Sequence, residues 1–211
     1  MIGGKSTRFG SDKGLFKFRG KALISYLIEI LIRFNKDIFL VANSKYQVHD
    51  YMSNIDFTNI MGFIIDEDDL TSDQESNSPL IGLCSAFKEL KELEYEKVFV
   101  LPCDTPLVKF EVINLLIKQC KKFDCCIPKW KDGLLEPLLA IYPVAEAYET
   151  SLINIKQKRY KLTKIIGKEW KTKYVSVEED FKKIDPNLFS FKNINKLDDI
   201  NNLKSLLSEK K

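Results

Sequence analysis

Short apolar runs alternate with amphipathic segments along the first half of the chain. The runs with the length of buried β-strands lie at 38–42, 63–65 and 97–101. Apolar positions recur at helical spacing in the segments 25–34, 79–93 and 111–122. This alternation predicts a Rossmann-like α/β fold, in which a mostly parallel sheet is covered by helices on both faces.

The second half continues this alternation without a segment that would separate two domains. We expect strands at 125–128 and 138–142 and an edge strand at 173–176. Helices are expected at 144–156, 162–168 and 197–208. The acidic, serine-rich segment 67–78 is expected to be a long loop, and Pro79 fits the first turn of the helix after it. Because the sequence contains no repeat and no linker, residues 1–211 are predicted to form a single domain.

Composition and charge exclude several classes of partner. The 33 basic and 30 acidic side chains leave a net charge of only +3, and the lysines are scattered beside glutamates, so nucleic-acid binding is not expected. The longest apolar stretch, 22–34, is too short and too polar to span a membrane. The five cysteines form no C-x-x-C pair, and their odd number argues against a disulfide framework. No signal peptide is recognisable in the sequence, so a cytoplasmic protein is expected. His49 is the single histidine and is interpreted as a surface residue.

The residue types most suggestive of chemistry lie near the start of the chain. Adjacent glycines, Gly3 and Gly4, are followed by Arg8, Asp12 and Lys13. Backbone N–H groups in a glycine-rich turn, together with fixed cations, can bind a polyphosphate. The spacing matches neither the Walker A loop nor the dinucleotide fingerprint. From spacing alone, a basic surface loop remains the alternative.

Polar residues also follow three of the predicted strands, namely Asn43, Asp66 and Asp104. Ligands of doubly wound sheets bind outside the carboxyl ends of the strands. A basic loop facing two carboxylates suits a nucleotide with Mg²⁺, which takes one or two carboxylates together with phosphate oxygens and water. Asp104 is therefore the candidate metal ligand. Its alternative role is to cap the following helix, although Thr105 could do so instead.

Five motifs, taken in order, resemble the molybdenum cofactor guanylyltransferase family, which is a nucleotidyltransferase of the nucleotide-diphospho-sugar transferase type. The likeness covers about residues 1–200. The motifs are the run from Gly3 to Lys13, Pro79-Leu80-Ile81-Gly82, Leu101-Pro102-Cys103-Asp104-Thr105-Pro106, Glu136-Pro137-Leu138 and Asn193-Ile194-Asn195.

The resemblance implies transfer of GMP from GTP to molybdopterin, with release of pyrophosphate and with Mg²⁺ as cofactor. It implies catalytic roles for Lys13, Arg8 and Asp104, with Asp104 as the metal ligand. The residues expected to bind GTP are Met1, Ile2, Gly3, Gly4, Lys13, Asp66 and Asp104. Asn193 and Asn195 are expected on the pterin side, whereas Glu136 matches a motif without an assigned role. Transient contact with molybdoenzyme maturation proteins is a further expectation.

The resemblance also implies a first strand before Gly3, where the printed sequence has only Met1 and Ile2. We therefore expect a fold whose first strand is missing. Two alternative functions remain open at this point. One is a nucleotidyltransferase that acts on a sugar phosphate or another cofactor. The other is a non-catalytic relative that binds a nucleotide or a pterin.

Overall fold

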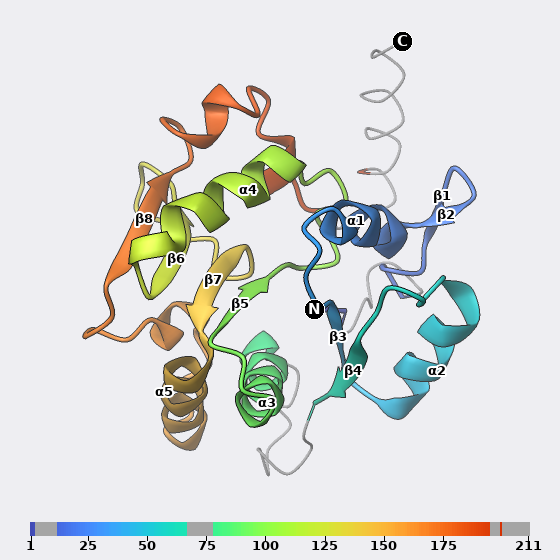
Figure 1. Cartoon of the computed structure of the whole chain (residues 1–211), viewed down its shortest axis with the longest axis horizontal. Coiled ribbons are helices and arrows are strands. Elements are labelled where there is room, and N and C mark those ends of the chain that lie inside the picture. The colour runs from blue at the N-terminus through green and yellow to red at the C-terminus, as the bar shows by residue number, and fades with distance from the viewer. Residues whose placement is uncertain (3–11, 67–77, 195–198, 200–211) are drawn as a thin grey trace.

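The computed structural model describes residues 1–2, 12–66, 78–194 and 199, and its strands and helices alternate (Figure 1). The strands are β1 (Lys17–Phe18), β2 (Lys21–Ala22), β3 (Phe39–Ala42), β4 (Gly62–Ile65), β5 (Lys97–Val100), β6 (Cys125–Lys129), β7 (Ala140–Pro143) and β8 (Thr172–Ser176). The α-helices are α1 (Leu23–Ile32), α2 (Lys45–Asn54), α3 (Pro79–Glu92), α4 (Phe110–Gln119) and α5 (Val144–Lys156). The 3₁₀ turns are η2 (Cys120–Lys122), η3 (Leu162–Ile165), η4 (Phe181–Lys183) and η5 (Phe189–Phe191).

The main strands form two ladders. β3 and β4 pair in parallel, with Phe39 opposite Gly62 and Ala42 opposite Ile65. The other ladder has the order β5-β7-β6-β8, in which β6 and β8 are parallel and β7 is antiparallel to both neighbours. The predicted α/β class is confirmed, and β8 lies at the sheet edge as expected. The antiparallel β7 makes the sheet mixed.

Met1 and Ile2 lie between these two ladders. The amino group of Met1 donates to the Leu101 carbonyl at 2.9 Å, and the Met1 carbonyl accepts from Cys103 N–H at 3.1 Å. On the other side, Ile2 N–H donates to the Val41 carbonyl at 2.9 Å. These two bonds to the end of β5 have the pattern of a parallel bridge opposite Pro102. The two residues therefore join β3 to β5 at the carboxyl ends of both strands.

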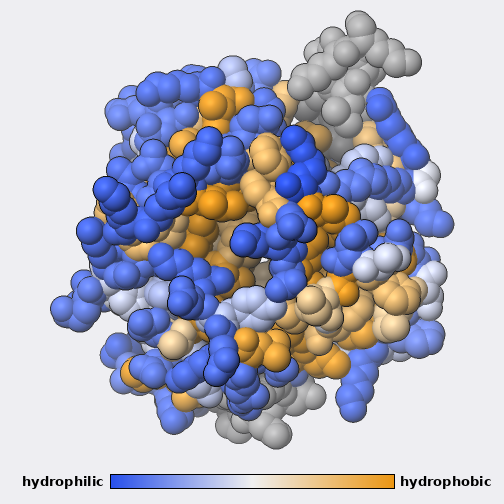
Figure 2. Space-filling view, viewed as in Figure 1, coloured by the Kyte–Doolittle hydropathy of each residue, from blue (hydrophilic) through white to orange (hydrophobic). Residues whose placement is uncertain are grey.

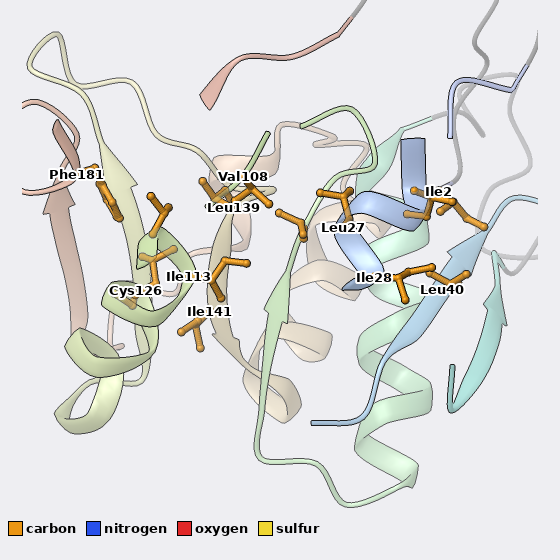
Figure 3. Packing of buried hydrophobic residues seen from close by; sticks show 14 of the residues in the cluster. Ile2, Leu27, Ile28, Leu40, Val108, Ile113, Cys126, Leu139, Ile141 and Phe181 are labelled. Carbon is orange, nitrogen blue, oxygen red and sulfur yellow. The ribbon is translucent and has the colours of Figure 1, made fainter. Parts of the chain in front are cut away.

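Helices cover both faces of the sheet. In Figure 1, α1 and α4 lie above the strands, whereas α3 and α5 lie below them. The buried faces are apolar: α1 contributes Leu27 and Ile28 to a core cluster that also contains Leu40 and extends to Phe181 (Figure 3). Below the sheet, α3 packs on α5 in a second cluster. The carboxyl ends of β3, β4 and β5 are thus held in place by packing on both sides.

One predicted element is wrong and two were missed. The helix expected at 162–168 is only the 3₁₀ turn η3, because the chain turns at Gly167, where Trp170 N–H bonds to the Gly167 carbonyl and the indole fills the space that a Cβ would occupy. The polar helix α2 and the hairpin β1–β2 were not predicted. The helix expected at 197–208 lies outside the described residues, apart from Asp199.

Candidate active site

Side chains from distant parts of the sequence meet at the carboxyl ends of the central strands. Lys13 follows the glycine-rich run, and Asp104 follows the end of β5. Lys13 Nζ lies 3.4 Å from Asp104 Oδ2, and both side chains are largely buried, with 15% and 23% exposed. A cation and a carboxylate thus form an ion pair at the sheet end where ligands of α/β proteins bind.

The alternative role of Asp104 as a helix cap is excluded. Helix α4 begins at Phe110, and its N-cap residue is Lys109. Asp104 Oδ1 is buried and has no hydrogen-bond partner among the described residues. A buried carboxylate oxygen without a partner is costly unless a ligand or ion satisfies it. The site therefore fits a hard cation at this oxygen.

No group of three or more His, Cys, Asp and Glu side chains that could hold a metal is present in the described ranges. Mg²⁺ does not require such a group, since it commonly uses one or two carboxylates and takes its other ligands from substrate phosphates and water. Asp104, whose Oδ1 is buried without a partner among the described residues, is the residue that would hold such an ion. A single carboxylate of this kind suits a cation that is also bound by the phosphates of a nucleotide.

Asp12, which precedes Lys13 in the chain, is held by three hydrogen bonds that the sequence alone did not reveal. Its Oδ1 accepts from the Tyr51 hydroxyl at 2.7 Å and from Gly14 N–H at 2.9 Å, and its Oδ2 accepts from Gln47 Nε2 at 2.5 Å. A Cβ at Gly14 would overlap the Tyr51 hydroxyl, which explains the glycine. Burial raises the pKa of Tyr51, and the nearby Asp12 carboxylate adds to that increase.

Helix α2 supplies Gln47 and Tyr51, and its start could have been found from the sequence. Ser44 is its N-cap and accepts from Gln47 N–H at 3.2 Å. Asn43, which the sequence placed among the strand-end candidates, instead belongs to this helix start, because its N–H donates to Gln47 Oε1 at 2.8 Å. A serine followed by a polar helix is a usable but weak signal.

Asp66 ends β4 and packs against helix α3. Its N–H donates to the Ala42 carbonyl at 2.9 Å. A Cβ placed on Gly82 would lie 2.7 Å from Asp66 Oδ1 and 3.0 Å from Met1 Cε, so the absent side chain of Gly82 makes room for both residues. Burial lowers the pKa of the Met1 amino group. Cys103, Asp104 and Asp66 lie near enough to raise this pKa in part, because negative charge stabilises the ammonium form.

A pocket of about 240 Å³ opens beside Asp104. Asp104, Glu136 and Asn193 are among its lining residues. The segment around Asn193 is tied to the site because Ile194 N–H donates to the Asp104 carbonyl at 2.8 Å. Glu136 Oε1 accepts from Trp130 Nε1 at 2.7 Å, and burial raises the pKa of this carboxyl. The pocket therefore places the Glu136 carboxyl and the Asn193 amide next to the Lys13–Asp104 ion pair.

Cys103 is not a nucleophile in this arrangement. Burial raises the pKa of its thiol to about 11, so the sulfur is protonated at neutral pH. Its position after β5, in contact with the core, is that of a packed structural residue. The single histidine, His49, is exposed on α2, as expected.

The structure brings together six of the predicted site residues, namely Met1, Ile2, Lys13, Asp66, Asp104 and Asn193. The other four predicted residues, Gly3, Gly4, Arg8 and Asn195, lie outside the described residues. Their expected roles remain predictions.

Comparison with known proteins relates this chain to one family of nucleotidyltransferases. The profile of the family described as "MobA-like NTP transferase domain" matches residues 1–171. A probable molybdenum cofactor guanylyltransferase of Pyrococcus horikoshii is 33% identical over 85% of each chain, and one of Thermococcus gammatolerans is 31% identical over 96% of each.

A solved structure supports the same relationship. Molybdopterin-guanine dinucleotide biosynthesis protein A from Archaeoglobus fulgidus superposes with a TM-score of 0.76 at 26% identity, and covers 99% of this chain and 96% of its own. A 4-diphosphocytidyl-2C-methyl-D-erythritol synthase from Anaerococcus prevotii, at 14% identity and a TM-score of 0.64, shares the fold.

Proposed function

We propose that this chain, which belongs to the MobA-like NTP transferase domain family, transfers GMP from GTP to the terminal phosphate of molybdopterin and releases pyrophosphate. The observation that carries the proposal is the Lys13–Asp104 ion pair at the carboxyl ends of the central strands, with a pocket beside it. The names of the relatives support guanylyl transfer to a molybdenum cofactor as the reaction.

The reaction is a displacement at the α-phosphorus of GTP. A phosphate oxygen of the acceptor forms a bond to that phosphorus, and the bond to the bridging oxygen between the α- and β-phosphates breaks. The electron pair leaves with pyrophosphate. An ionised phosphate is already a nucleophile at neutral pH, so no general base is needed, in accord with the single histidine. Catalysis of this kind depends mainly on positioning and on charge neutralisation.

The residues divide between these two tasks. Lys13 places a cation beside the phosphates, and its orientation is maintained by Asp12, to which α2 is bonded. Asp104 would hold Mg²⁺, which when bound neutralises charge on the phosphate oxygens. Met1, Ile2 and Asp66 lie where the nucleotide would bind, together with Gly3, Gly4 and Arg8 by their motif match. We assign Arg8, with Lys13, to charge on the α-phosphate and on the departing pyrophosphate.

The pocket beside Asp104 is our proposed acceptor site. Asn193 and Glu136 line it, and Asn195 follows closely in the sequence. An acceptor phosphate bound there would meet the nucleotide at Asp104.

The setting of the reaction is also part of the proposal. All five cysteines are free thiols, and no helix in the described part of the chain is long and apolar enough to cross a membrane. We propose a cytoplasmic reaction, with transient contact to molybdoenzyme maturation proteins that receive the product.

Transfer of label from α-³²P-GTP to molybdopterin, with Mg²⁺ present, tests the function. We expect labelled dinucleotide product and stoichiometric pyrophosphate. Unlabelled GTP should suppress the signal, whereas equal concentrations of CTP, UTP or ATP should not. Stronger competition by CTP or UTP would favour a transferase with another nucleotide and contradict the proposal. Nucleotide binding without any transfer would favour a non-catalytic relative.

A further inference from the structure

Two of the five cysteines meet where helix α4 is followed by strand β6. Cys120 begins η2 at the end of α4, and Cys126 is the second residue of β6. Both belong to the core cluster on the α1 and α4 face of the sheet, where Figure 3 shows Cys126. The neighbouring Cys125 belongs to the cluster on the α3 and α5 face, as the alternation of a strand requires. Cys120 and Cys126 therefore share one side of the sheet, and Cys125 points to the other.

The sulfur atoms of Cys120 and Cys126 are in hydrogen-bond contact. The Cys126 thiol donates to Cys120 Sγ. Cys120 Sγ in turn donates to the Phe123 carbonyl at 3.6 Å. Lys97 Nζ donates to the same carbonyl at 2.6 Å, which places an ammonium group close to the Cys120 sulfur. Because a disulfide requires two side chains whose sulfur atoms can approach one another, this pair is suited to form one.

The surroundings make Cys120 the better nucleophile of the two. The hydrogen bond from Cys126 lowers the pKa of Cys120; burial opposes this effect, and the Lys97 ammonium lowers the pKa further. The same hydrogen bond, together with burial, raises the pKa of Cys126. Burial raises the pKa of Cys125 to about 12, so this neighbour remains a thiol at neutral pH. Since thiolates are oxidised before thiols, Cys120 is the residue that reacts first.

Access to Cys120 favours a small oxidant. The side chain is 3% exposed, and it lines a pocket of about 550 Å³ together with Lys97 and Lys121. Figure 2 shows a hollow with apolar atoms inside it near the middle of this face of the molecule. A peroxide fits such an approach better than a bulky disulfide reagent does.

We propose that Cys120 and Cys126 form a peroxide-sensitive dithiol that closes reversibly to a disulfide. The Cys120 thiolate attacks one oxygen of hydrogen peroxide, the O–O bond breaks, and the hydroxide that leaves takes up a proton to become water. The Cys126 sulfur then attacks the sulfenic sulfur of Cys120, and the S–O bond breaks. The second hydroxide leaves as water with the proton of the Cys126 thiol. Two electrons pass from the thiols to the peroxide, and a reducing thiol such as glutathione restores the pair.

The proposal is independent of the proposed reaction, because neither cysteine belongs to the candidate active site. It is tested by treating the folded, reduced full chain with hydrogen peroxide, alkylating the remaining thiols and mapping tryptic peptides by tandem mass spectrometry. Trypsin cuts after Lys121 and Lys122, so the expected disulfide joins two separate peptides. We expect this linked pair, with a mass loss of about 2 Da that dithiothreitol reverses.

Single serine variants separate the roles of the cysteines. Cys126→Ser should accumulate a sulfenic acid at Cys120 that dimedone traps, and Cys120→Ser should leave Cys126 reduced. Cys125→Ser is the matched control, because it removes the adjacent thiol on the opposite face, and it should form the disulfide as the wild type does. Circular dichroism establishes that each variant is folded.

The wild-type chain decides the question if a variant fails to fold. In the reduced wild type, iodoacetamide at neutral pH should label Cys120 at least about 10-fold faster than Cys125. Equal labelling rates would overturn the proposal. So would a disulfide that links Cys120 to Cys125, oxidation spread evenly over all five cysteines, or a Cys120–Cys126 disulfide that forms only after the chain is unfolded in urea.

Discussion

Lys13 and Asp104 are separated by 91 positions in the sequence, yet their charged atoms lie 3.4 Å apart. Side chains from helix α2 hold the segment next to Lys13. Asp12 is held by Gln47 and Tyr51, and Gly14 leaves room for the Tyr51 hydroxyl. At the scale of single residues, the candidate site is an ion pair whose surroundings are held by a small set of hydrogen-bonded side chains.

Gly82→Ala tests the packing between helix α3 and Asp66. An alanine in a helix normally stabilises by about 1 kcal/mol relative to glycine. Here the added Cβ would lie 2.7 Å from Asp66 Oδ1, so we expect the free energy of unfolding to fall by about 1–3 kcal/mol. Urea denaturation measures the change, with the exposed Glu92→Ala on the same helix as the control. A stabilised Gly82→Ala variant would show that α3 does not approach Asp66 closely.

Glu136→Gln tests the environment of the second carboxyl in the acceptor pocket. Burial raises the pKa of Glu136, so the folded state binds this proton more tightly than the unfolded state. Its contribution to stability is therefore greatest at low pH and is lost as the pH rises through the folded-state pKa.

The Glu136→Gln side chain does not titrate in this range, and its amide oxygen can still accept the hydrogen bond from Trp130 Nε1. We expect its free energy of unfolding to fall less than that of the wild type between about pH 4.5 and pH 7. Denaturation curves across this range measure the difference. Identical pH profiles would mean that the carboxyl is solvated in the folded state.

At the scale of elements, helix α2 connects Asp12 to the sheet. The Gln47 side chain donates to the Ile2 carbonyl at 3.0 Å and accepts from Asn43 N–H at 2.8 Å, so its amide links Ile2 to the residue that follows β3. The same amide nitrogen bonds to Asp12. One buried side chain thus joins the residue after β3, Ile2 and Asp12, the neighbour of Lys13 in the chain.

Gln47→Ala should therefore impair both folding and activity. Leaving these backbone groups and Asp12 without their partner should cost about 2–4 kcal/mol of unfolding free energy. We also expect a lower rate of GMP transfer, because Asp12 no longer holds Lys13 in place. His49→Ala, at an exposed position of the same helix, should change neither quantity appreciably. Wild-type activity in a stably folded Gln47→Ala variant would contradict this role.

The sequence pattern predicted the buried elements well and the polar ones poorly. The strand 97–101 and the helix 144–156 were recognised because their apolar positions follow the period of each structure. Helix α2 was missed because it buries few residues, chiefly Gln47 and Tyr51, and has no apolar stripe. The roles of Gln47 and Tyr51 depend on contacts with Asp12 across more than 30 residues, and no local pattern encodes such contacts.

At the scale of the whole molecule, one core cluster extends from Ile2 through α1 and α4 to Phe181. This continuity leads us to expect a single cooperative unfolding transition, in keeping with the predicted single domain. Far-UV circular dichroism and the fluorescence of Trp130 and Trp170 should give coincident midpoints in urea. Two separated transitions would instead show that the part around β3 and β4 unfolds independently of the β5–β8 sheet.

The central claim is that the Lys13–Asp104 pair catalyses GMP transfer. Its most direct test is the rate of pyrophosphate release from GTP and molybdopterin, in Mg²⁺, by Asp104→Asn and by Glu92→Gln, an exposed carboxylate on α3. We expect Asp104→Asn to lower kcat by about 100-fold or more while the variant remains folded, and Glu92→Gln to leave kcat unchanged. A folded Asp104→Asn variant with a kcat close to that of the wild type would contradict it.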